Sequence, residues 1–125
     1  MTKRAIVPTA TLSVYEIYLP IATVSLANMR EHWAVRARRA KQHRQQAYLL
    51  TAALKSLRLP ATVILTRVAP RLLDDDNLRG ALKSVRDGIA DRLCIDDRDP
   101  RVTWRYGQEK GRPKQRGVLV RITPG

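Results

Sequence analysis

Residues 61–93, ATVILTRVAPRLLDDDNLRGALKSVRDGIADRL, combine two sequence patterns that together indicate the fold class. Residues 61–68 are rich in β-branched side chains and almost continuously apolar, which predicts a strand inside a sheet, ended by Pro70. The part that follows predicts an amphipathic helix, because its apolar residues recur at spacings of four, three, four and four. These residues are Leu78, Leu82, Val85, Ile89 and Leu93. A buried strand followed by such a helix predicts a domain that mixes α and β structure.

The flanking sequence adds one helix and three strands. Residues 11–19 alternate between apolar and polar side chains, which predicts a first strand. Residues 33–57 are rich in Ala, Arg, Gln and Leu without Gly or Pro, which predicts a helix of several turns. Residues 101–108 and 117–124 alternate as two further strands, and we expect them to form a hairpin. The order β-α-β-α-β-β predicts a single-domain α/β (α+β) fold, with a mixed four-stranded sheet covered by two main helices.

The chain length of 125 residues suits one modest hydrophobic core and not two domains. We expect residues 1–10 to form a flexible tail and residues 11–125 to form the domain. Pro8 and Glu16 interrupt any apolar run near the N-terminus, which argues against a secretory signal. The single cysteine, Cys94, cannot form an internal disulfide, and with two histidines it does not favour a zinc site. We therefore expect a cytoplasmic protein that does not engage a membrane.

The formal charge of +13, from 24 Lys and Arg residues against 11 Asp and Glu, indicates a polyanionic partner. Nucleic acid is favoured over a membrane surface, because no long apolar run exists and the basic residues are spread over several segments. Many of them fall in the first half of the 33–57 helix and in the loop before residue 117. We expect phosphate contacts from Arg36, Arg38, Arg39, Lys41, Arg44, Lys110, Arg112, Lys114 and Arg116. A solvated helix face and a solvated loop tip are the alternatives.

Negative charge is concentrated between residues 74 and 99, which hold eight of the 11 acidic residues. Aspartates at a helix start and in a turn can serve simply as an N-cap and as turn formers. Carboxylates so close together repel one another unless a cation offsets their charge, and Mg²⁺ or Mn²⁺ accepts oxygen ligands alone. Such an ion would also let an acidic site act on a phosphate, because it polarises the phosphate and lowers the pKa of an attacking water. The pattern favours metal-assisted phosphodiester hydrolysis, with the cap and turn roles as the alternative.

Three stretches of the chain resemble the RusA-type Holliday-junction resolvases, small dimeric endodeoxyribonucleases of bacteria, prophages and phages. The sequence DDDNL at 74–78 matches the family's Asp-x-Asp-Asn-Leu motif, and DD at 96–97 matches its later Asp-Asp pair. The segment LPIATVSLANMREHWAVRARRAKQHR, 19–44, is similar to the family's Pro, Asn and basic residues before the first helix. The resemblance covers about residues 11–124 and implies Mg²⁺-dependent nicking of branched DNA, such as Holliday junctions, in recombination and repair.

The resemblance also implies which residues form the site. By position, Asp74 and Asp76 match the family's first two catalytic acids and Asp97 the third, with Asp96 beside it. These four aspartates are therefore the expected ligands of Mg²⁺, for which Mn²⁺ would substitute.

One departure from the family pattern concerns a lysine four residues after the second motif aspartate, where this chain has Gly80. Lys83 is the candidate substitute as a catalytic residue. It follows Asp76 by seven residues, close to two full helical turns, and so lies on the same side of the helix. A simple surface pair with Asp87 is the alternative for this lysine.

The position of Asp97 raises a geometric question. An unbroken helix between the two acidic motifs would separate its ends by about 25 Å, which the four residues after it do not readily span. Either the helix stops near Gly88 and the chain doubles back, or Asp97 joins Asp74 and Asp76 of a second subunit across a two-fold axis. We expect a homodimer in both cases, because two symmetric nicks need two sites. A non-catalytic nucleic-acid-binding protein and a metal-dependent ribonuclease are the alternative functions.

Overall fold

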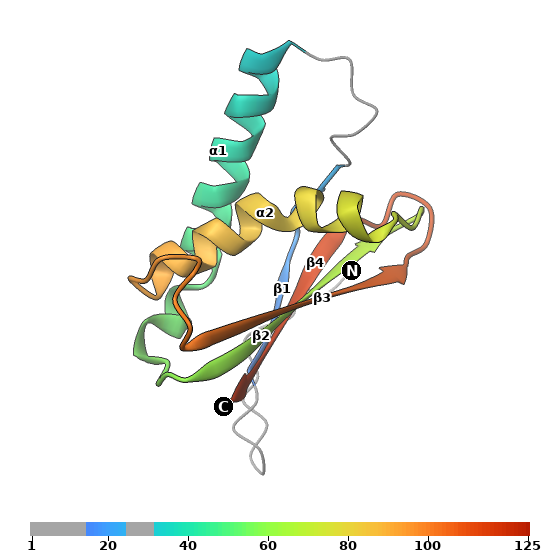
Figure 1. The fold of residues 1–125 in the computed structure, drawn as a ribbon. Coiled ribbons are helices and arrows are strands. Elements are labelled where there is room, and N and C mark those ends of the chain that lie inside the picture. The colour runs from blue at the N-terminus through green and yellow to red at the C-terminus, as the bar shows by residue number, and fades with distance from the viewer. Residues whose placement is uncertain (1–14, 25–31) are drawn as a thin grey trace.

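The computed structural model of the protein describes residues 15–24 and 32–125, and its elements follow in the predicted order (Figure 1). The strands and helices are β1 (Tyr15–Leu19), α1 (Trp33–Leu50), the short 3₁₀ helix η1 (Ala52–Ser56), β2 (Ala61–Ala69), α2 (Asp75–Arg92), β3 (Val102–Lys110) and β4 (Gly117–Pro124). The predicted mixed four-stranded sheet with two main helices is confirmed. The predicted tail, 1–10, and the start of the predicted first strand, 11–14, lie outside the described residues.

The sheet has the strand order β1-β4-β2-β3, so the predicted hairpin between the last two strands is wrong. β2 lies between them, parallel to β3 and antiparallel to β4. Its central residue Leu65 is paired with Tyr106 on one side and with Val120 on the other. Alternation within each strand is compatible with either arrangement. Burial of the most apolar strand between two neighbours decides between them.

α2 begins and packs as the sequence pattern predicts. The Asp74 carboxylate caps the helix by accepting a hydrogen bond of 3.0 Å from the backbone N–H of Asn77. The apolar stripe faces the sheet, and Leu82, Val85 and Ile89 are fully buried in the core. The three aspartates therefore lie at the N-terminus of a helix whose apolar face is fixed in the core.

α1 ends earlier than predicted, at Leu50 instead of continuing to residue 57. The Thr51 hydroxyl donates a 2.7 Å hydrogen bond to the Ala47 carbonyl, and η1 then turns the chain so that Leu54 is buried. The apolar second half of α1 packs on the core only in part, because Ala47 is buried whereas Leu49 and Leu50 are exposed. Figure 1 shows α1 crossing α2 and projecting its first turns beyond it. Within the described residues, no helix is both long enough and apolar enough to cross a membrane.

Arg67 connects the segments that lead into the two helices. This arginine lies on β2 and is 4% exposed. It donates hydrogen bonds to the Thr23 hydroxyl, at 3.1 Å, and to the Arg71 carbonyl, at 2.8 Å. Burial, and to a lesser degree the positive charge of Arg116, lower the pKa of its guanidinium from the ordinary value. Arg67 thus holds the loop that positions the acidic start of α2.

Candidate functional site

The first acidic motif lies at the exposed start of α2. Asp74 is the N-cap, and Asp75 and Asp76 occupy the first turn with exposed side chains. A single aspartate satisfies the cap, as the hydrogen bond from Asn77 to Asp74 shows. A role as helix cap therefore explains Asp74, but it does not explain Asp75 and Asp76, whose carboxylates are not used by the cap. Positive charge at the helix N-terminus favours negative charge there.

The second acidic motif returns to the middle of α2 after the helix has ended. The helix does not stop near Gly88 but continues to Arg92, so that detail of the predicted geometry is wrong. Cys94 adopts a positive φ of 57°, and the Ile95 N–H donates to the Ala90 carbonyl, which reverses the chain. Asp96 then accepts a hydrogen bond from the backbone N–H of Arg98 in a turn. The chain thus doubles back within one subunit, but beyond the end of a complete helix.

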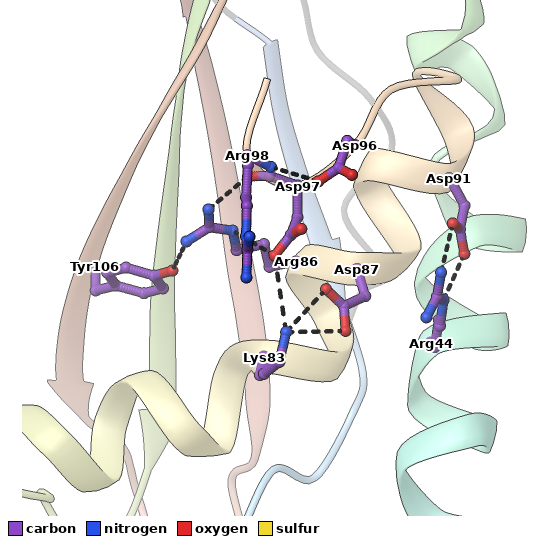
Figure 2. Close-up of polar contacts among 9 residues, drawn as sticks. All are labelled: Arg44, Lys83, Arg86, Asp87, Asp91, Asp96, Asp97, Arg98 and Tyr106. Atoms are coloured by element: carbon purple, nitrogen blue, oxygen red, sulfur yellow. Dashed lines mark hydrogen bonds and ion pairs between the residues drawn. The ribbon is translucent and has the colours of Figure 1, made fainter. Parts of the chain in front are cut away.

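Lys83 lies between two carboxylates (Figure 2). Its ammonium is 3.4 Å from both carboxylate oxygens of Asp87 and 3.7 Å from the nearer oxygen of Asp97. The lysine side chain is 64% exposed, so each of these contacts contributes little to stability. The surface pair with Asp87 is present, and the same ammonium also contacts one of the predicted catalytic acids.

The structure brings only some of the predicted site residues together. Asp97 lies beside Lys83, which is seven residues beyond Asp76, or roughly 10 Å along the axis of α2. Within residues 15–24 and 32–125, no group of three or more acidic, histidine or cysteine side chains is arranged to hold a metal ion. Asp74 and Asp76 are thus separated from Asp96 and Asp97. The last two instead line a cavity of about 260 Å³ together with Lys83, Asp87, Asp91 and Arg44.

Arg86 is a residue of this region that the sequence pattern did not single out. Its guanidinium donates one 2.6 Å hydrogen bond to the Tyr106 hydroxyl and another to the backbone carbonyl of Asp97 (Figure 2). The same group lies 4.9 Å from the centre of the Trp104 ring. Arg86 therefore ties the Asp97 loop to β3. The one signal in the sequence was the alternation of aromatic and basic residues at 104–106, which places both rings on one side of a strand.

The basic residues predicted to contact DNA lie in two places. On α1, Arg36, Arg38 and Lys41 are exposed and Arg39 is half-buried. The loop between β3 and β4 exposes Arg112, Lys114 and Arg116, and Lys110 ends β3. Figure 1 places this loop at the end of the sheet where α2 begins. The Gln108 side-chain oxygen accepts a 2.8 Å hydrogen bond from the Leu73 N–H, which fixes β3 to the loop before the acidic helix start.

Gly80 lies beside the basic half of α1. A Cβ placed on this glycine would meet no atom within 4 Å. A small cavity of about 40 Å³ at this position is lined by Arg36, Arg39 and His43 of α1. Burial, and then the charge of Arg39, lower the pKa of His43 from its ordinary value. Position 80, where the RusA-type family pattern has a lysine, therefore has free space around it and lies next to basic residues of α1.

Arg44 differs from the other predicted DNA-binding residues because it already has an anionic partner. Its guanidinium donates two hydrogen bonds to the Asp91 carboxylate, at 2.7 and 2.8 Å, and joins α1 to α2 (Figure 2). These hydrogen bonds lower the pKa of Asp91 and raise that of Arg44. Arg44 is therefore better placed to hold the two helices together than to contact a phosphate.

The Arg44–Asp91 pair yields a prediction about stability and pH. We expect Asp91→Asn to lower the free energy of unfolding at pH 7 by about 0.5–1 kcal/mol, because both side chains are partly exposed. The pKa of Asp91 is lower in the folded state, so the pair stabilises fully above the unfolded pKa of about 3.9. That contribution is lost as the pH falls through the lower, folded pKa. Urea unfolding from pH 7 to pH 2.5 would check this, and a difference between the two proteins that does not shrink in acid would contradict it.

Comparison with known proteins adds one partial match. No protein-family model matches the chain. An uncharacterized protein of Xylella fastidiosa (strain Temecula1 / ATCC 700964) is 40% identical to it over 82 residues, which cover 57% of this chain. The chain spans about half of that relative, 52% of its length. This similarity assigns neither a family nor an activity.

Proposed function

We propose that the protein is a Mg²⁺-dependent endodeoxyribonuclease that nicks branched DNA such as Holliday junctions. The observation that carries the proposal is a row of charged side chains along α2, in a chain whose net charge is +13. Asp76 stands in the first turn, and Lys83 and Asp87 follow on the same side. The loop after the helix adds Asp97 to this row. The exposed carboxylate of Asp76 and the half-buried ones of Asp87 and Asp97, with a lysine among them, are suited to a metal ion and a phosphodiester.

The carboxylates at the start of α2 suit Mg²⁺ in their chemistry. This ion prefers oxygen ligands, and it is commonly held by one or two carboxylates together with waters and substrate phosphates. Asp76 would hold it together with Asp74, one of whose oxygens is engaged in the helix cap. When bound, the ion polarises the scissile phosphate and favours the hydroxide form of an attacking water. Asp97 of the same chain lies about two turns farther along α2, so in this proposal it is not a ligand of the ion that its own chain's Asp76 holds.

The remaining residues of the row would position the DNA strand. The Lys83 ammonium is exposed and lies about two turns of α2 from Asp76, so it would bind a nearby phosphate of the same strand and help to orient the DNA. Arg86 holds the Asp97 loop in place through its backbone carbonyl. The basic residues of α1 other than Arg44, and those of the β3–β4 loop, would bind the phosphates on either side. In this assignment the basic residues of α1 and of the loop flank the row, and Asp74 and Asp76 lie next to the bond to be cut.

A substrate panel tests the proposed function. The purified protein is incubated with a labelled four-way junction, the matched linear duplex and an RNA of the same sequence, each with and without Mg²⁺. We expect nicking of the junction only with Mg²⁺, and junction binding that weakens steeply as salt rises. Cleavage of linear DNA or RNA in preference to the junction would contradict the proposed substrate but not the metal-dependent chemistry. Tight binding without cleavage of any substrate would contradict the proposal.

A homodimer is part of this proposal, because resolving a junction needs two nicks. Asp97 and Asp76 are separated within one chain. We therefore expect Asp97 of one subunit to complete the site formed by Asp76 of the other subunit. Mixing Asp76→Asn chains with Asp97→Asn chains should then restore a measurable part of the activity that each variant lacks alone. The measurement is nicking by heterodimers purified with two different affinity tags. Inactive heterodimers would show that both aspartates act within one subunit.

A non-catalytic DNA-binding protein is the second candidate function, and particular contacts favour it. Asp74 is used as a helix cap, Asp96 and Asp99 accept backbone hydrogen bonds in a turn, and Asp97 is paired with Lys83. In this function the aspartates shape the start of α2 and the loop after it, and the basic residues bind DNA. The same panel separates the two candidates, since only the nuclease requires Mg²⁺ for a change in the DNA.

A further inference from the structure

A groove between α2 and β3 lies next to the acidic start of the helix. It has a volume of about 620 Å³ and is bordered by Asp75 of the first helical turn. β3 is an edge strand, so the groove opens at the side of the sheet. Trp104 and Tyr106 of this strand line it, and both rings are half-buried. The sequence pattern and the proposed metal site account for none of these aromatic contacts.

Each of the two aromatic rings is paired with an arginine from α2. The Arg86 guanidinium lies 4.9 Å from the centre of the Trp104 ring, and that of Arg79 lies 5.7 Å from the centre of the Tyr106 ring. Arg105 also lines the groove, so its three arginines outnumber its one carboxylate, Asp75. Aromatic rings and guanidinium planes stack on nucleobases of any sequence, and the excess positive charge suits the phosphates between them.

Two buried donors in this region lack an acceptor. Neither the Nε of Arg86 nor the indole Nε1 of Trp104 has a hydrogen-bond partner in the described part of the chain, although a carboxylate oxygen of Asp97 lies 4.0 Å from the Arg86 Nε. A buried N–H without an acceptor is unfavourable, so a ligand that supplies acceptors would be favoured there. The keto and ring-nitrogen atoms of a nucleobase are acceptors of this kind.

We propose that this groove binds an unpaired base of a DNA strand, stacked on the layer formed by Trp104, Tyr106 and their arginines. The inference rests on the proposed function in one respect, namely that the same strand passes the carboxylates at the start of α2. A base leaves its stack most easily where pairing is interrupted, as it is at a branch point. A groove that binds an unpaired base would therefore bind branched DNA more tightly than continuous duplex DNA. Arg86 links it to Asp97, since one guanidinium contacts Tyr106 and the Asp97 loop.

Tryptophan fluorescence tests this directly, because the chain has two tryptophans and Trp33 is 69% exposed on α1. In a Trp33→Phe protein the emission comes from Trp104 alone. The probes are an eight-nucleotide oligothymidylate and an abasic phosphodiester of equal length and charge, both in EDTA so that no cleavage occurs. We expect the oligothymidylate to quench Trp104 and to bind about tenfold more tightly than the abasic strand. Equal affinities, with Trp104 emission unchanged at saturation, would overturn the inference.

A pair of matched variants excludes a general effect of losing a tyrosine. Tyr106→Leu removes a ring from the groove, whereas Tyr48→Leu removes the ring beneath Arg92, 3.8 Å from it, at the end of α1. We expect the first variant to lose most of the tenfold preference for bases and the second to retain it. Mg²⁺-dependent junction nicking by the Trp33→Phe protein is measured in parallel. Nicking without any base preference overturns this inference alone, and base preference without nicking overturns the proposed function alone.

Discussion

Asp76→Asn is expected to reduce Mg²⁺-dependent nicking of a four-way junction by roughly a hundredfold to a thousandfold, the range for losing one electrostatic group of an active site. The reason is the place of Asp76 in the first turn of α2, exposed and not used as the helix cap. Asparagine keeps the size of the side chain and removes the charge that would hold the ion. The measurement is the rate of a single turnover with the protein in excess over a labelled junction.

The control for this variant is Asp75→Asn, which changes the neighbouring residue in the same helical turn. We expect it to retain nicking within a few fold. Both variants should bind the junction in EDTA at least as tightly as the unaltered protein, because each removes a negative charge near the phosphates. Equal losses of activity in the two variants would indicate that total charge, and not a ligand at position 76, sets the rate.

Gly88→Ala is expected to destabilise the fold by about 3 kcal/mol or more, because overpacking at this position has no easy relief. A Cβ at Gly88 would overlap the Arg44 carbonyl oxygen and lie 2.7 Å from the Ala47 Cβ. The first of these atoms belongs to the backbone of α1, so the two helices would have to separate. A loss of this size is a large part of the stability of a small domain. It would lower the melting temperature by about 10 °C or more.

Gly80→Ala is the matched control, since both glycines lie within α2 and only one of them touches another helix. A Cβ at Gly80 has no neighbour within 4 Å, so alanine there should stabilise the protein by about 0.5–1 kcal/mol through its higher helix propensity. Thermal unfolding followed by circular dichroism at 222 nm compares the two. A Gly88→Ala protein as stable as the unaltered one would show that α1 and α2 do not pack as closely as described.

The helices and strands could be predicted from the sequence because each depends on residues that are close together in the chain. The spacing of Leu78, Leu82, Val85 and Ile89 predicts the buried face of α2, and these residues are in the core. The apolar run at 61–68 predicts a strand inside the sheet, and β2 has a neighbour on each side. The order of elements and the fold class follow from the same patterns. The end of α1 was missed, since alanine and leucine favour a helix whether or not tertiary contacts continue it.

The fold class, the excess of positive charge and the confinement of most acidic residues to one stretch could all be predicted before the chain was seen folded. Each depends on residue type and short-range spacing. Tertiary structure alone decided that β2 separates β3 from β4, that Asp97 lies beside Lys83, and that Arg86 stacks on Trp104. These contacts join segments through the packing of a whole core, and many chain paths satisfy the same local patterns. The sequence shows that the acidic residues are clustered. Only the folded chain shows that Asp74 and Asp76 lie at the start of α2 and Asp97 beside its middle.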